Sequence, residues 1–93
     1  MIKAVYTQMG LIMGDFTDET ETSYEINNPV MIITQRENVA LVPLLALMEE
    51  SSIVIKKDSI MSGKTFTPVL EIVNNYNATY GSGLVQVTGN FKL

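Results

Sequence analysis

The sequence predicts a mostly β fold, a small and strongly bent antiparallel sheet or barrel with one short C-terminal helix. Three observations support this prediction. Runs of β-forming residues with alternating polarity occupy most of the chain. Glycines interrupt or bound these runs, which is typical of bulges and sharp bends. After residue 66 the spacing of apolar residues becomes helical. The 93 residues are expected to form one domain that spans residues 1–93.

The expected strands are separated by polar turns. In chain order they cover residues 2–9, 11–17, 24–34, 39–48 and 51–57, with a further short strand considered at 59–61. Gly14 is the expected bend, because a residue without a Cβ lets a strand curve tightly and approach its neighbour. Asn27 to Pro29 is expected to kink the third strand. Pro43 favours a sheet edge or a bulge, since proline cannot donate to a ladder.

The C-terminal part predicts one amphipathic helix over residues 67–80. Thr67 is a plausible N-cap and Pro68 suits the first turn. Four apolar residues recur at helical spacing and are expected to dock onto the sheet: Val69, Val73, Tyr76 and Tyr80. Gly81 is expected to end the helix, and a final strand is expected at about residues 83–88.

The composition predicts self-association. Hydrophobic residues make up 46% of the chain and charged residues only 17%, and the mean hydropathy is +0.20. A domain of this size has a thin core and buries only part of its surface. Large exposed apolar patches are rare on monomers. We therefore expect a homo-oligomer in which subunit interfaces cover the apolar surplus.

The residue inventory argues against catalysis. The chain has no histidine and no cysteine, which removes the commonest general bases, nucleophiles and zinc ligands. We therefore expect no enzyme, no cofactor and no metal site. Gly63-Lys64-Thr65 matches the end of a phosphate-binding loop, but Asp58 stands where that motif needs its first glycine. The acids around Asp15 lack the alternation and glycine of a calcium loop.

The expected compartment is the cytoplasm, with no membrane partner. The N-terminus has no basic segment followed by an apolar region, as a secretory signal would. The longest apolar run, residues 39–48, is about half the length that a membrane-spanning helix needs. The absence of cysteine excludes disulfides.

Positive charge is concentrated in one short region of an acidic chain. The net charge is −4, and three of the six Lys and Arg residues are Lys56, Lys57 and Lys64. One interpretation is a polar turn whose lysines protect a strand end from edge pairing. The other is a small phosphate-binding site that ring symmetry would multiply. Because strand side chains alternate, we expect Lys56 to reach a ligand and Lys57 to face another way.

Two motifs resemble the Sm-like family of ring-forming RNA-binding proteins, and in appearance the Sm-like proteins of marine cyanobacterial phages. The first motif is "VYTQMGLIMGDFTDETETSYEINNPV", with Gly10 and Gly14 at the two glycine positions. The second is "VIKKDSIM", with Lys56 at the basic position. The resemblance implies a closed homo-oligomeric ring of small β-barrels. It also implies RNA or single-stranded DNA as ligand, in phage or host nucleic-acid processing.

The departures from the family pattern indicate what kind of binding to expect. The loop "TDETETS" lacks the Asn that holds a base in this family, so binding is expected to depend on phosphate contacts. The predicted nucleic-acid site is Lys56, Lys57 and Lys64. The alternative function is a structural or assembly ring of a phage particle that binds proteins, which the acidic and apolar composition favours.

Overall fold

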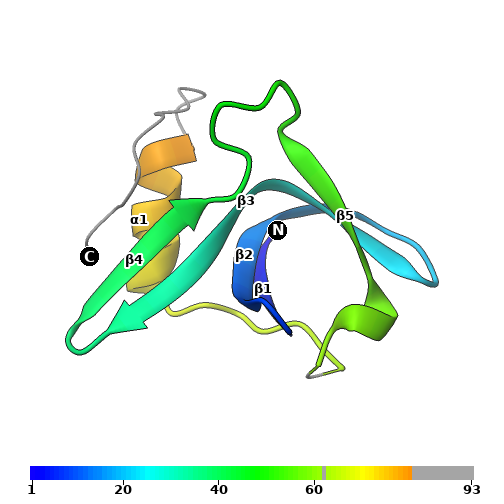
Figure 1. Cartoon of the computed structure of the whole chain (residues 1–93), viewed down its shortest axis with the longest axis horizontal. Coiled ribbons are helices and arrows are strands. Elements are labelled where there is room, and N and C mark those ends of the chain that lie inside the picture. Colours follow the sequence, from blue (N-terminus) through cyan, green and yellow to red (C-terminus); the bar gives the residue numbers. More distant parts are fainter. Residues whose placement is uncertain (62, 81–93) are drawn as a thin grey trace.

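The computed structural model describes residues 1–61 and 63–80 (Figure 1). Over this part of the chain it contains strands β1 (Ile2–Thr7), β2 (Gly10–Glu19), β3 (Ser23–Gln35), β4 (Asn38–Pro43) and β5 (Ser52–Lys56), the short 3-10 helix η1 (Lys57–Ser59) and the α-helix α1 (Leu70–Tyr80). All strand pairs are antiparallel. The predicted fold class is therefore confirmed: a mostly β, bent antiparallel sheet with one short C-terminal helix. The strand expected at residues 83–88 lies outside the described residues.

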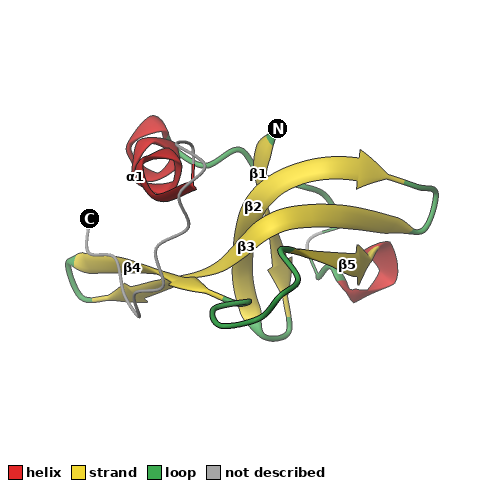
Figure 2. Cartoon of the chain, turned by 90° about the horizontal axis from the view of Figure 1, so that it is seen from above, coloured by secondary structure: helices red, strands yellow, loops and turns green. Residues whose placement is uncertain are grey.

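Strand β3 organises the sheet because it is long enough to change partners along its length. The strand order is β1-β2-β3-β4, and β5 also pairs with β3. The first part of β3, Ser23 to Asn27, pairs with β5, and the second part, Val30 to Gln35, pairs with β4. The two parts meet at Asn28, whose φ of 50° lies in the left-handed region. The expected kink at residues 27–29 is confirmed. Figure 2 shows β2 and β3 curving together through this region.

The barrel alternative is not realised, because no strand ladder closes the sheet within the described residues. Instead, the segment that follows η1 runs beside β1 through separate contacts. The Met61 amide donates to the Tyr6 carbonyl at 2.7 Å, and Ala4 and Phe66 exchange two backbone hydrogen bonds of 2.7 and 2.9 Å. Thr7 and Ile60 form a further isolated bridge. The sheet is thus bent far enough to bring its two ends near each other without forming a continuous ladder.

Gly14 permits the bend, as the sequence predicts. The register between β2 and β3 shifts between Met13 and Asp15, which marks an irregularity at this glycine. A Cβ on Gly14 would lie 2.9 Å from the Asn27 carbonyl oxygen and 3.3 Å from Pro29 Cα, and it would overlap the Ile26 side chain. Since two of these three neighbours are backbone atoms, the space for a side chain does not exist.

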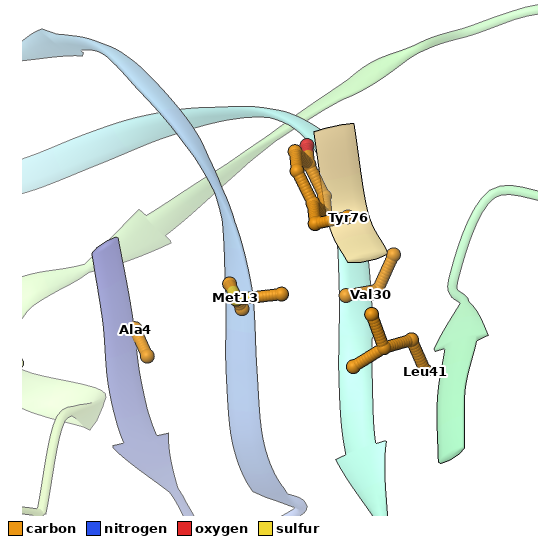
Figure 3. Packing of buried hydrophobic residues seen from close by; sticks show 5 residues of the cluster. All are labelled: Ala4, Met13, Val30, Leu41 and Tyr76. Atoms are coloured by element: carbon orange, nitrogen blue, oxygen red, sulfur yellow. The ribbon is translucent and has the colours of Figure 1, made fainter. Parts of the chain in front are cut away.

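The sheet buries apolar side chains on both faces. One cluster joins Ala4, Met13, Val30 and Leu41 to Tyr76 of α1 (Figure 3). The other cluster consists of Val5, Ile12, Ile26 and Ile60. Neighbours such as Ala4 and Val5 belong to different clusters because strand side chains alternate between faces. We call the first the helix face and the second the groove face.

Helix α1 begins at Leu70, three residues later than expected. Thr67 does not cap the helix; its Oγ1 accepts a hydrogen bond of 2.8 Å from Lys3 Nζ, beside the Phe66 contact with β1. These contacts hold the preceding chain against the sheet, and the first helical bond joins the Val73 amide to the Val69 carbonyl at 3.1 Å. Val69 is 67% exposed, so its expected place in the docked stripe is wrong.

The docked side of α1 is formed by Ile72, Tyr76, Thr79 and Tyr80. Tyr76 is almost fully buried, and its one hydroxyl proton is shared between the carbonyl oxygens of Asn27 and Asn28, which lie 3.1 and 2.8 Å from the hydroxyl oxygen. Tyr80 packs against it with a ring-centroid separation of 4.9 Å. The helix therefore satisfies two backbone carbonyls at the kink of β3 while it covers the helix face.

The strand expected over residues 39–48 ends early. β4 stops at Pro43, and residues 44–51 form a loop that leads to β5. The Leu44 amide donates to the Pro29 carbonyl at 3.0 Å, and the Asn28 amide donates to the Ser51 carbonyl at 2.6 Å. Both ends of the loop are thus attached to the kink of β3, and the chain between them turns away from the sheet.

Candidate nucleic-acid interface

The two adjacent lysines have different environments. Lys57 Nζ lies 2.6 Å from Glu19 Oε2 and 4.9 Å from the centroid of the Tyr24 ring. The hydrogen bond from Lys57 to Glu19 raises the pKa of the Lys57 ammonium above its usual value. Lys57 is therefore a charged, locally neutralised group that links η1 to the hairpin of β2 and β3. Its charge is already matched within its own chain.

Lys56 is exposed and ends strand β5. Ser52, Val54 and Lys56 share one face of this strand because its side chains alternate, while Ile53 and Ile55 pack on the groove-face cluster. Within residues 1–61 and 63–80, no carboxylate forms a salt bridge with Lys56. Of the two lysines, Lys56 is the one whose side chain is available to an anion.

Lys56 lines a groove of about 910 Å³ along β5. The groove runs between this strand and the turn that joins β1 to β2. Its lining is largely apolar and includes Met9, Ile12, Leu44, Ile53, Val54 and Met61. Lys56 and Asp58 are the charged residues among its lining side chains. The groove is thus an apolar channel with one cation and one carboxylate near the end of β5.

Lys64 lies elsewhere. Its Nζ is 5.5 Å from the centroid of the Phe66 ring, on the segment that runs beside β1. It does not line the groove that contains Lys56. The structure therefore does not bring the three predicted lysines to one site within a single chain. Gly63 has a φ of 70°, and six residues, 64–69, lie between it and the start of α1. The phosphate-loop interpretation fails because no helix follows Lys64 directly.

Three acidic residues, Asp18, Glu19 and Glu21, lie at the far end of the hairpin that β2 and β3 form. Thr20 Oγ1 organises its turn by accepting from the amides of Thr22 and Ser23 at 3.3 and 3.0 Å.

Over residues 1–61 and 63–80, no three Asp or Glu side chains gather closely enough to hold a metal ion. In the same part of the chain, no helix has the length and hydropathy needed to cross a membrane.

Sequence reasoning missed the groove and the exposed apolar residues around it. Met9 and Met61 end the expected strands 2–9 and 59–61, whereas in the structure Met9 lies in the turn between β1 and β2 and Met61 lies beyond η1, with exposed fractions of 72% and 64%. The only sequence signal was the overall apolar surplus, which gives the amount of such surface and not its place. No family model matches this chain, and no curated protein matches it.

Proposed function

We propose that this protein is a non-enzymatic, cytoplasmic, closed homo-oligomeric ring that binds single-stranded RNA or DNA through phosphate contacts of Lys56. The observation that carries the proposal is the contrast between the two adjacent lysines. Lys57 is neutralised by Glu19, whereas Lys56 is exposed at the rim of an apolar groove. An exposed ammonium is a suitable phosphate ligand, and symmetry repeats it in an oligomer.

Self-association is supported by strand edges and by exposed apolar side chains. Among the described residues, β4 and β5 each pair with β3 and leave their opposite edges without a ladder. Unpaired edges are templates for pairing with another chain, and closure of a ring removes them. The segment expected to pair between neighbours is residues 39–48 or the GLVQV run at residues 83–87; of the first, residues 39–43 lie on the open edge of β4 and residues 44–48 lie in the following loop, while the second lies outside the described residues. Exposed Met9, Val54 and Met61 supply apolar area for the same assembly.

Binding is expected to be weak and salt-sensitive, because it depends on phosphate contacts. The test compares wild type with Lys56→Glu and with the matched control Lys64→Glu. Fluorescence anisotropy of a short uridine- or adenine-rich RNA, and of the corresponding single-stranded DNA, is measured at low and moderate salt. Lys56→Glu should abolish binding, while Lys64→Glu should have a smaller effect. If wild type binds neither strand at low salt, the nucleic-acid part of the proposal is wrong.

A second candidate is a structural or assembly ring that binds proteins. One observation favours it: Leu47 and Met48, at the loop between β4 and β5, are strongly exposed and are followed by Glu49 and Glu50. Apolar side chains flanked by acids suit a protein surface better than a phosphate backbone. Light scattering with and without an oligonucleotide separates the candidates, because an assembled protein that ignores the oligonucleotide supports the second.

A further inference from the structure

The loop between β4 and β5 presents two apolar side chains to solvent. We call residues 44–51 the tip loop. Leu47 is 85% exposed and Met48 is 61% exposed. The loop is attached to the kink of β3 at both ends, through Leu44 and Ser51, and a turn closed by a 3.1 Å bond from the Met48 amide to the Leu45 carbonyl supports its outer part. The exposed pair is therefore held in place by defined backbone contacts.

Leu47 is an unfavourable residue for this position in an isolated chain. Its φ is 69°, in the left-handed region where asparagine and glycine are better tolerated than leucine. Leu47 also leaves most of its apolar side chain in water. Neither the backbone conformation of residue 47 nor its burial within a single chain explains why leucine occupies this position. A contact that removes the side chain from water would offset both costs.

The same chain carries a complementary surface along β5, and Leu44 at the base of the tip loop is part of its lining. The tip loop leads into β5 and η1 follows it (Figure 1), so Lys56 lies at the end of the strand that is farther from the tip loop. The groove along β5 is apolar, with Met9 and Met61 exposed beside it, and Lys56 provides a cation. Leu47 and Met48 do not line the groove of their own chain. On the tip loop, Glu49 and Glu50 follow the apolar pair.

We infer that the tip loop of one copy seats in the groove of the next copy, with Leu47 and Met48 against its apolar lining and Glu49 or Glu50 beside Lys56. The inference rests on the proposed self-association. Because the two surfaces differ, the contact is head-to-tail, the kind that generates a ring when its rotation closes. Asp58 also lines the groove near Lys56 and would repel an incoming carboxylate, so the contact requires the acid to lie nearer to Lys56 than to Asp58.

The contact has a consequence for nucleic-acid binding. A carboxylate of the neighbouring copy and a phosphate would compete for the same ammonium of Lys56. Binding of an oligonucleotide is then weaker than an uncontested lysine would give. Replacing Glu49 and Glu50 by glutamine removes the competing charge, so at protein concentrations where light scattering shows the double variant still assembled it should bind the oligonucleotide more tightly than wild type at low salt.

The first test is Leu47→Asp, followed by light scattering over a range of protein concentrations. Aspartate tolerates a positive φ better than leucine, so this variant is expected to fold. Its molar mass should fall toward the 10.3 kDa of one chain, with association weakened by about tenfold or more, as at a central interface residue. Leu70→Asp is the matched control, because Leu70 is 72% exposed at the start of α1. It should assemble as wild type does.

The second test exchanges the charges. Lys56→Glu should weaken assembly, and combining it with Glu49→Lys and Glu50→Lys should restore it. Restored assembly supports the contact, because the exchanged charges would then attract each other across the contact between two copies. If wild type is an oligomer and Leu47→Asp assembles equally well, the tip-loop contact is wrong while the ring proposal stands. If wild type is a monomer at every concentration, both are wrong.

Discussion

The two faces of the sheet are completed in different ways. On the helix face, α1 covers the cluster of Ala4, Met13, Val30 and Leu41, and Tyr76 connects the helix to the kink of β3. On the groove face, the cluster of Val5, Ile12, Ile26 and Ile60 adjoins a groove with exposed methionines beside it. One face is closed by the chain itself, whereas the other leaves apolar surface for a partner. We therefore expect stability to depend mainly on the helix face and the proposed association on the groove face.

The largest effect is expected on the helix face. Tyr76→Ala removes the buried ring and both hydrogen bonds to the β3 kink, and it should lower the free energy of unfolding by about 4 kcal/mol. Urea denaturation followed by circular dichroism measures this loss. Leu70→Ala, at an exposed position of the same helix, is the control. A loss below about 1 kcal/mol, the scale of an ordinary surface change, would mean that α1 does not stabilise the sheet.

Gly14→Val should destabilise the packing on both faces of the sheet, because both apolar clusters depend on the bend of β2 at Gly14. The added side chain would meet the Asn27 carbonyl and Pro29 Cα, and the overpacking should cost about 3 kcal/mol. Gly63→Ala is the control, because a Cβ on Gly63 meets nothing within 4 Å and only its φ of 70° opposes the change. The control should lose about 1 kcal/mol. Equal melting temperatures for wild type and Gly14→Val would contradict the close approach.

Tyr76→Phe isolates the hydrogen bonds of the helix face and should cost about 1 kcal/mol at neutral pH. Burial raises the pKa of Tyr76 above its ordinary value of 10.0, and burial likewise raises the pKa of Tyr80. The pKa of Tyr76 is higher in the folded state than in the unfolded state. The contribution of the neutral Tyr76 hydroxyl to stability is therefore complete below pH 10, and it is lost as pH rises above the unfolded-state pKa. Urea titrations above pH 10 should show a smaller decline for Tyr76→Phe than for wild type. Identical declines would exclude Tyr76 as the source.

The smallest effect on the isolated chain is expected on the groove face. Met9→Ser changes a residue that is 72% exposed, and at the lowest measurable protein concentration it should alter stability by less than about 0.5 kcal/mol. As protein concentration increases, wild type should gain stability through association and the variant should gain less. Thermal melts over a concentration series test this difference. Parallel behaviour of the two proteins would show that the groove face remains uncovered.

Several features of the fold follow from local sequence alone. Alternating β-forming residues predict β1, β2 and β3, because successive side chains of a strand point to opposite faces of the sheet. Gly14 marks the bend, since it is the residue that offers no Cβ where another strand approaches. The helical spacing of Val73, Tyr76 and Tyr80 locates α1, although Val69 of the same predicted stripe lies exposed before the helix. These signals are short-range and do not depend on a partner.

Other features were decided by contacts between distant parts of the chain. β4 ends at Pro43 rather than Met48 because Leu44 and Ser51 bond to the kink of β3, which draws residues 44–51 away from the sheet. α1 starts at Leu70 because Phe66 and Thr67 are held by Ala4 and Lys3 of β1.

The difference between the environments of Lys56 and Lys57 was also decided by contacts between distant parts of the chain. Adjacent in sequence, Lys56 and Lys57 have the same chemistry, and alternation predicts only that they point different ways. Glu19, 38 residues from Lys57, neutralises that lysine because the β2 and β3 hairpin brings the carboxylate to η1. The groove beside Lys56 exists because β5 pairs with β3 on one edge and leaves the other open toward the β1 and β2 turn. Strand pairing thus decides which lysine has a carboxylate partner in its own chain, and no local sequence pattern shows it.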